Sequence, residues 1–160
     1  MKDHTCCFLG HRKIIETKEL IQELTETIKK LITDKDVDTF LFGSKSSFDD
    51  LCLEIVTKLK EDHPHIKRVY VRAEYPDISD DYKAYLLKRY EQTYYPADVL
   101  GAGKAVYIER NYEMINKSRY CIFYYDEKCA PTARKSGCKL ALEYARKQHK
   151  EIMVFSHSTL

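Results

Sequence analysis

Two apolar runs of the sequence each end in a glycine that is followed by polar residues. Cys6-Cys7-Phe8-Leu9 leads into Gly10-His11-Arg12, and Thr39-Phe40-Leu41-Phe42 leads into Gly43-Ser44-Lys45. If both runs are strands of one parallel sheet, their loops meet at the sheet edge where α/β proteins bind small molecules. Glycine lets the backbone approach a ligand closely, and the arginine and lysine nearby suit an anion. The sequence therefore predicts a site for an anionic small molecule.

Three further segments could complete such a site. Arg72 comes at the end of a predicted third strand, so we expect it at the same sheet edge. Ser136-Gly137 opens the last predicted helix, where free backbone N–H groups favour an anion. Asp49, in the first turn of another helix, suits ribose hydroxyls or a base edge. The alternative for Asp49 and Asp50 is helix capping by Ser46 and pairing of the carboxylates with the helix dipole.

The standard nucleotide-binding fingerprints are absent from the chain. No Gly-x-Gly-x-x-Gly follows the first strand, and no Gly-x-x-x-x-Gly-Lys-Ser/Thr occurs anywhere. A nucleotide site must therefore be built differently. We expect sugar or base near Asp49, and phosphate nearer Arg12, Arg72 or the Ser136-Gly137 helix start.

Strand and helix patterns alternate along the chain. Apolar runs predict strands at 5–9, 39–42, 67–73, 119–125 and 151–155, and helical spacing predicts helices at 16–33, 48–61, 79–90, 104–117 and 136–149. Repeated strand–helix units imply a parallel sheet that is covered on both faces. We predict an α/β fold, a Rossmann-like three-layer sandwich with a mostly parallel five-stranded sheet, as one domain over residues 1–160.

The composition narrows the class of protein. Lys+Arg 27 against Asp+Glu 25 gives a formal net charge of +2, without the basic bias of a dedicated nucleic-acid-binding protein. No apolar stretch approaches the roughly 20 residues of a membrane span, and no apolar signal region follows the start Met-Lys-Asp-His. We expect a cytoplasmic protein whose partners include neither membranes nor nucleic acids.

The six cysteines lack the spacing of a metal site. They form no Cys-x-x-Cys and no tight Cys/His cluster. We predict reduced thiols that pack as small apolar side chains, with no metal and no cofactor. Cys129 and Cys138 flank a predicted loop and could meet.

Tyrosines concentrate between the third and fourth predicted strands. Such side chains join a flat apolar face to a polar tip, so this segment could stack a base, cover a pocket or bury a subunit interface. The last alternative predicts a homodimer or a higher homo-oligomer. The tyrosines concerned are Tyr75, Tyr82, Tyr85, Tyr90, Tyr94, Tyr95, Tyr107 and Tyr112.

Five motifs in order resemble one family across nearly the whole chain. They are Cys-Cys-Phe-Leu-Gly-His-Arg, Phe-Leu-Phe-Gly-Ser-x-x-x-Phe-Asp, Arg-Ala-Glu-Tyr-Pro, Glu-Arg-Asn-x-x-Met-Ile-x-x-Ser-x-Tyr-Cys-Ile-Phe-Tyr-Tyr and Ser-Gly-x-Lys-x-Ala. This order is similar to that of small single-domain SLOG proteins. The resemblance implies a Rossmann-like domain that binds a nucleotide or an ADP-ribose-type molecule. Some branches of that superfamily sense cyclic or other nucleotide signals in antiphage defence. The pocket it implies comprises Gly10, His11, Arg12, Gly43, Ser44, Asp49, Arg72, Tyr75, Arg110, Asn111, Ser136 and Gly137.

One branch of the superfamily hydrolyses nucleoside monophosphates at the N-glycosidic bond, and its motif is altered here. That branch carries Pro-Gly-Gly-x-Gly-Thr-x-x-Glu, whereas this chain has Ala141 at the position of the glutamate. Glu143 is two residues out of register, which turns it by about 200° on a helix. Only Asp49 or Glu74 could then serve the sugar chemistry.

Three functions follow as hypotheses. The first is non-catalytic binding of a nucleotide or ADP-ribose-derived molecule, for sensing through a separate partner or for sequestration. The second is an N-glycoside hydrolase or transferase that uses Asp49 or Glu74. The third is a partner protein in cell division or DNA processing, which the resemblance also implies.

Overall fold

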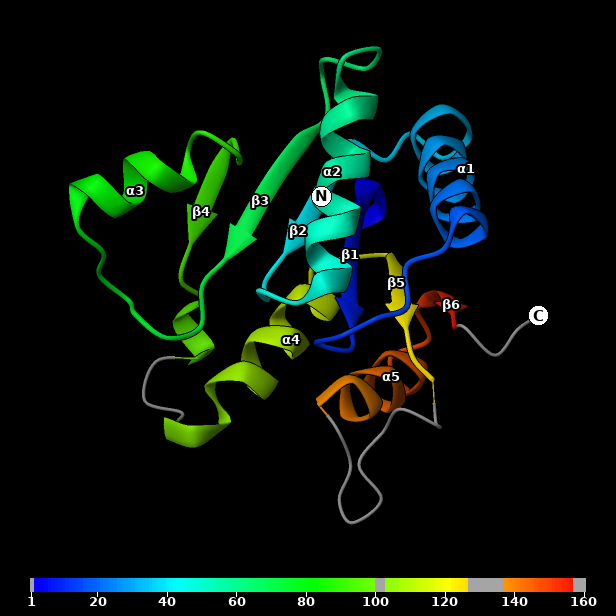
Figure 1. Cartoon of the computed structure of the whole chain (residues 1–160). Coiled ribbons are helices and arrows are strands. Elements are labelled where there is room, and N and C mark those ends of the chain that lie inside the picture. The colour runs from blue at the N-terminus through cyan, green and yellow to red at the C-terminus, as the bar shows by residue number, and fades with distance from the viewer. Residues whose placement is uncertain (1, 100–102, 127–136, 157–160) are drawn as a thin grey trace.

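The computed structural model of the chain describes residues 2–99, 103–126 and 137–156. Its sheet has six strands in the order β4-β3-β2-β1-β5-β6, and all neighbouring strands are parallel (Figure 1). The strands are β1 (Thr5–Gly10), β2 (Thr39–Phe42), β3 (Lys67–Val71), β4 (Gln92–Tyr94), β5 (Tyr120–Tyr124) and β6 (Glu151–Phe155).

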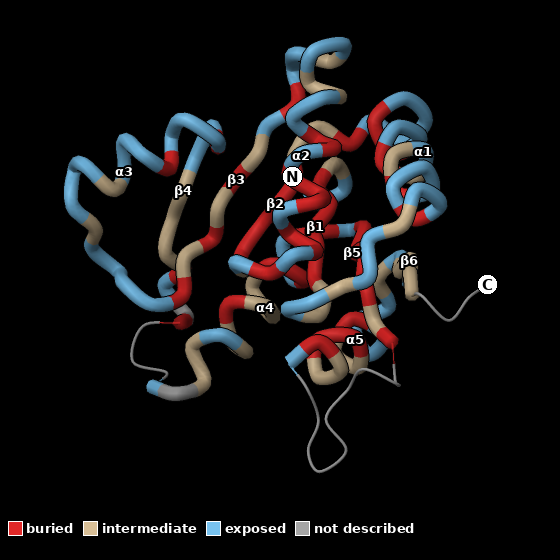
Figure 2. The backbone as a smooth tube through the Cα atoms, in the orientation of Figure 1, coloured by how far each residue is buried: buried red, intermediate tan, exposed pale blue. Residues whose placement is uncertain are grey.

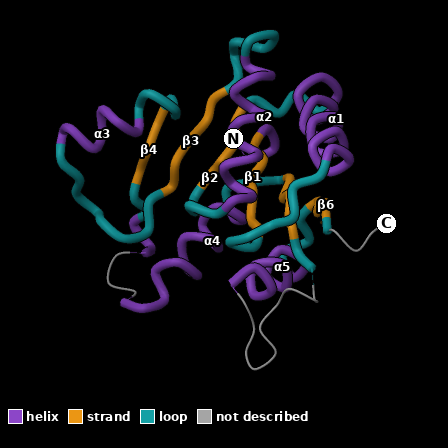
Figure 3. The backbone as a smooth tube through the Cα atoms, viewed as in Figure 1, coloured by secondary structure: helices purple, strands orange, loops and turns teal. Residues whose placement is uncertain are grey.

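Helices cover both faces of this sheet (Figure 3). Two of them, α1 (Lys18–Asp34) and α2 (Ser47–Lys60), pack on one face, and α4 (Val106–Asn116) and α5 (Gly137–Lys147) pack on the other. The short helix α3 (Asp80–Leu86) connects β3 to β4 and lies at that end of the sheet. The predicted Rossmann-like three-layer sandwich is thereby confirmed.

The alternation of side chains along β1 explains why there are two helical layers. Cys6 and Phe8 point into the core under α1 and α2, whereas Cys7 and Leu9 point into the core under α4 and α5. Both faces of the central strands are apolar, so both must be covered. Figure 2 shows this pattern, with β1, β2 and β5 buried and α3 largely exposed.

The predicted count of five strands is wrong, because β4 forms a sixth strand at the edge of the sheet. Its three residues pair with Val69–Val71 of β3, and the N–H of Arg72 donates to the carbonyl of Tyr94 at 2.8 Å. Gln92-Thr93-Tyr94 is not an apolar run, and only pairing with a neighbour makes it a strand. Several predicted elements are also shorter in the structure, since β3 ends at Val71, α3 ends at Leu86 and α5 ends at Lys147.

The cysteines of the described residues are buried and free, as the sequence predicts. Five are free and buried, namely Cys6, Cys7, Cys52, Cys121 and Cys138. Cys129 and its possible contact with Cys138 fall outside the described residues. Within the described part of the chain, no helix combines the length and the apolar character needed to cross a membrane.

Candidate functional site

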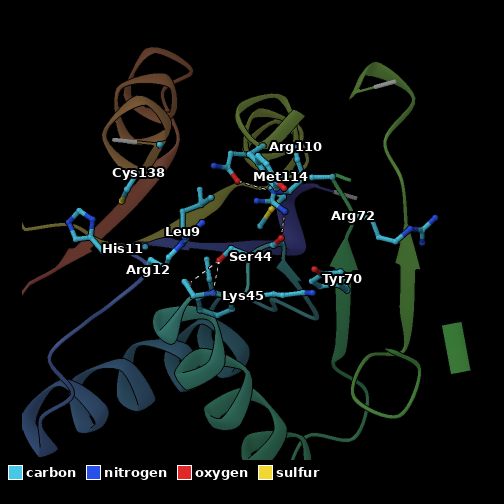
Figure 4. Close-up of a pocket in the computed structure, with 18 of the residues that line it drawn as sticks. Leu9, His11, Arg12, Ser44, Lys45, Tyr70, Arg72, Arg110, Met114 and Cys138 are labelled. Carbon is cyan, nitrogen blue, oxygen red and sulfur yellow. Dashed lines mark hydrogen bonds between the residues drawn. The ribbon is translucent and has the colours of Figure 1, made fainter. Parts of the chain in front are cut away.

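An open cavity of about 1400 Å³ lies at the carboxyl ends of β1, β2 and β3. From β1 the chain adds β2, β3 and β4 on one side, and it then crosses over to add β5 and β6 on the other side of β1. The strand order therefore reverses at β1, and the loop after β1 lines the cavity. Ligands of open α/β sheets bind at such a point. Figure 4 shows Arg12, Ser44 and Lys45 together there, with Arg110 and Met114 on α4 above them.

Most residues that the sequence and the resemblance pointed to line this cavity. They are Gly10, His11, Arg12, Gly43, Ser44, Arg72, Glu74, Tyr75, Arg110, Asn111 and Gly137. Ser136 falls outside the described residues. Asp49 lies elsewhere, behind the loop that carries Gly43 and Ser44, and only 3% of its surface is exposed.

Asp49 holds the loop after β2 from behind. Its Oδ2 accepts the backbone N–H groups of Gly43 at 3.1 Å and Ser44 at 2.9 Å, and its own N–H donates to the Ser46 hydroxyl at 3.1 Å. Ser46 therefore caps α2 as the sequence indicated. The carboxylate itself faces the loop, which leaves it without access to a sugar in the cavity.

Arg110 completes this loop from the other side. Its Nη1 donates to the carbonyl of Gly43, and its Nε donates to Asn111 Oδ1 at 3.0 Å. A buried cation and a buried carboxylate thus bind the two sides of the same short stretch of backbone. Arg110 is 5% exposed and still lines the cavity, so its guanidinium both fixes the loop and contributes positive charge to the site.

Burial is the largest influence on the pKa of Asp49. It raises the pKa of Asp49 to about 6, against the N–H bonds from Ser44 and Gly43 and the charge of Arg110, which lower it. Asp49 Oδ1 is buried and has no hydrogen-bond partner in the described part of the structure. The hydrogen bonds and the charge of Arg110 therefore do not fully offset the cost of burying the ionised carboxylate.

The two glycines serve packing as well as loop shape. A Cβ on Gly10 would meet Cγ of Phe48 at 2.6 Å, and a Cβ on Gly43 would meet Sδ of Met114 at 2.6 Å and Cδ of Arg110 at 2.7 Å. Close approach of a ligand is therefore not the only reason for glycine at these positions. Both residues are needed to bring α2 and α4 against the ends of the strands.

The ring of His11 contacts the loop after β5. Its Nε2 lies 2.9 Å from the backbone nitrogen of Asp126 and 3.2 Å from the carbonyl oxygen of the same residue. Burial lowers the pKa of His11, with a smaller opposing effect from Asp126. The ring also lies 5.3 Å from that of Tyr125. His11 thus links the loops after β1 and β5 and does not add a permanent positive charge.

The Arg72 guanidinium donates hydrogen bonds to residues close to it. Its Nη1 donates to the Thr93 hydroxyl at 3.1 Å, its Nη2 to the carbonyl of Pro76 at 3.1 Å, and its Nε to the carbonyl of Tyr75 at 3.4 Å. In Figure 4 its side chain lies apart from Arg12 and Lys45, near β3. Its main structural role is to fix the segment after β3.

The exposed basic side chains of the cavity are Arg12, Lys13 and Lys45. None of these side chains forms an ion pair or hydrogen bond with another residue that the structure describes. Lys13 was not among the predicted site residues, although its place directly after Arg12 could have indicated it. These three side chains are the ones free to bind an anion from solution.

Tyr107 and Glu74 form the opposite wall of the cavity. The Tyr107 hydroxyl donates to Glu74 Oε1, and this bond is the main reason why the pKa of Tyr107 is raised. The Arg110 guanidinium lies 5.8 Å from the centre of the Tyr107 ring. Tyr107 was singled out only as one of many tyrosines, but its place three residues before Arg110 on a helix puts both on one face.

The tyrosines of the segment between β3 and β5 lie in different environments. Tyr75, Tyr82 and Tyr107 line the cavity, while Tyr90 packs in the core with its ring centre 5.9 Å from that of Phe42. Self-association through the exposed members of this segment stays a prediction.

The YpsA family model, described as the YspA SLOG family, matches residues 10–160. No curated protein matches the chain.

Proposed function

This chain belongs to the YspA SLOG family, and from that premise we propose that its cavity binds an anionic small molecule of the nucleotide type. The observation that carries the proposal is the set of exposed basic side chains, Arg12, Lys13 and Lys45, at the reversal point of the strand order. With no partner among the described residues, they are available for a phosphate group. Gly137, the first residue of α5, also lines the cavity and adds the N-terminus of a helix to this end.

Binding without turnover is the form of the proposal that the site supports best. Asp49, one of the two carboxylates that could serve glycosidic chemistry, is buried and occupied by the loop N–H groups. Glu74 alone among the described lining residues is a carboxylic acid, and one of its oxygens accepts the Tyr107 hydroxyl. A single carboxylate lacks the acid and base pair that glycoside cleavage normally uses. We therefore favour sensing or sequestration of the ligand over its hydrolysis.

The first test replaces the free cations. We expect Arg12→Ala and Lys45→Ala each to weaken binding of a nucleoside monophosphate about tenfold, because each removes a charge-assisted hydrogen bond to phosphate. Isothermal titration calorimetry against GMP, AMP, CMP and UMP measures this. Chromatography of the recovered ligand in the same samples reports any turnover.

Lys58→Ala is the matched control, since Lys58 is an exposed lysine of α2 that does not line the cavity. The Lys58→Ala variant should bind the nucleoside monophosphate with the same affinity as the wild type. Equal losses in Lys58→Ala and Lys45→Ala would show a nonspecific charge effect and would overturn the site. If the wild type cleaves the ligand and Glu74→Gln does not, the protein is an enzyme and the proposal of binding without turnover is wrong.

A further inference from the structure

The exposed charged side chains that line the cavity lie at two ends. Arg12 and Lys45 follow β1 and β2, whereas Glu74 follows β3. Adjacent strands lie about 4.8 Å apart, so β1 and β3, on either side of β2, are separated by roughly 10 Å. The first end offers a phosphate side chains that have no partner among the described residues. At the second end, Arg72 and Arg110 already donate to Thr93 and to backbone carbonyls, and Glu74 is the exposed charged group. An elongated ligand that has an anionic group at one end and hydrogen-bond donors at the other would fit both ends of the cavity.

Glu74 is fixed in place on one oxygen only. Its Oε1 accepts the Tyr107 hydroxyl, and its Oε2 forms no hydrogen bond with another residue that the structure describes. Tyr107 is itself positioned by the Arg110 guanidinium over its ring. Glu74 is exposed to the cavity, so Oε2 can accept hydrogen bonds from a ligand.

Flat apolar surfaces surround this carboxylate. Tyr75, which follows Glu74 directly, is 61% exposed and lines the cavity together with Tyr82 and Ile78. Tyrosine rings of this kind stack on a base or cover its edge. The base of a nucleotide therefore belongs at the Glu74 end, with its phosphate at the Arg12 end.

The chemistry of a carboxylate selects among the bases. An ionised carboxylate only accepts hydrogen bonds, and it repels the lone pair of a ring nitrogen. Adenine and cytosine present an amino group beside such a lone pair, whereas guanine presents two adjacent donors, N1–H and the 2-amino group. We propose that Glu74, held by Tyr107, recognises the donor edge of guanine, so that this cavity binds guanine nucleotides. This inference rests on the proposed function and specifies its ligand.

The test compares two ligands that differ by one amino group. GMP and IMP share the phosphate, the ribose and N1–H, and only GMP carries the 2-amino group. We expect the wild type to bind GMP about tenfold more tightly than IMP, as calorimetry will measure, because a hydrogen bond to a charged acceptor is lost in IMP. In Glu74→Gln we expect this preference to fall to within about twofold. Asp77→Asn is the control, an exposed acid of the same segment that does not line the cavity, and it should keep the wild-type preference.

The outcomes separate the two proposals. Equal binding of GMP, IMP and AMP by the wild type overturns guanine recognition and leaves nucleotide binding intact. A GMP preference that persists in Glu74→Gln overturns the role of Glu74. If no nucleoside monophosphate binds the wild type, both proposals fail. Preserved binding of IMP by Glu74→Gln shows that this variant is folded and that its phosphate end is intact.

Discussion

Replacing Gly10 by alanine is expected to lower the free energy of unfolding by about 1–3 kcal/mol, the usual cost of an overpacked core. The new Cβ would lie 2.6 Å from Cγ and 2.7 Å from Cβ of Phe48. Phe48 is fully buried and packs 5.7 Å from the ring of Tyr124, so it has little room to move. Urea unfolding of the variant and the wild type measures the difference.

Gly137→Ala is the control for this prediction, because no atom of the described residues lies within 4 Å of a Cβ built there. We expect its unfolding free energy to stay within about 0.5 kcal/mol of the wild type. Gly43→Ala should fall between the two, since its nearest contacts include Sδ of Met114 and Cδ of Arg110, in side chains that can shift. A loss in Gly137→Ala as large as that in Gly10→Ala would contradict the packing argument.

Stability should also depend on pH through Asp49. Burial raises the pKa of Asp49 from 3.8 to about 6 on folding, so the folded protein binds this proton more tightly than the unfolded chain does. The contribution of Asp49 to stability is then greatest below about pH 4 and is lost as the pH rises toward 6. The shift corresponds to a loss of about 3 kcal/mol.

The variant Asp49→Asn isolates this effect. An amide oxygen can replace Oδ2 as acceptor for Gly43 and Ser44, while the amide nitrogen takes the place of the unpartnered Oδ1. The difference in unfolding free energy between wild type and variant, measured by urea titration at several pH values, cancels the other titrating groups. We expect the wild type to lose about 3 kcal/mol relative to the variant between about pH 4 and pH 7. A difference that is independent of pH would show that Asp49 is ionised throughout.

The location of the cavity could be predicted from the sequence, because it depends on local patterns. Gly10 and Gly43 end apolar runs, Arg72 follows a third, and Gly137 opens a helix. Parallel strands bring all of these to one sheet edge whatever the details of packing are. The cavity accordingly contains all four residues.

The roles of individual side chains could not be predicted in the same way. Asp49 and Arg72 carry suitable charges, but the first is buried behind a loop and the second donates to Thr93 and two carbonyls. These contacts join residues that are distant in the sequence, so no local pattern reveals them. The strand β4 escaped prediction for the same reason, because its partner β3 defines it.

The order of the strands also has a consequence for how the chain folds as it is synthesised. The central strand β1 is made early, yet one of its edges pairs with β5, and the loops after these two strands join residues 115 positions apart. Until β5 leaves the ribosome, that edge of β1 has no partner among the strands described here, and contacts so distant in sequence form slowly. The cavity is lined in part by Gly137 and Cys138 of α5, which follows β5 in the chain, so it is among the last parts of the molecule to form. A nascent chain that stops before β5 would present an unpaired apolar strand edge, a site for association with other incomplete chains.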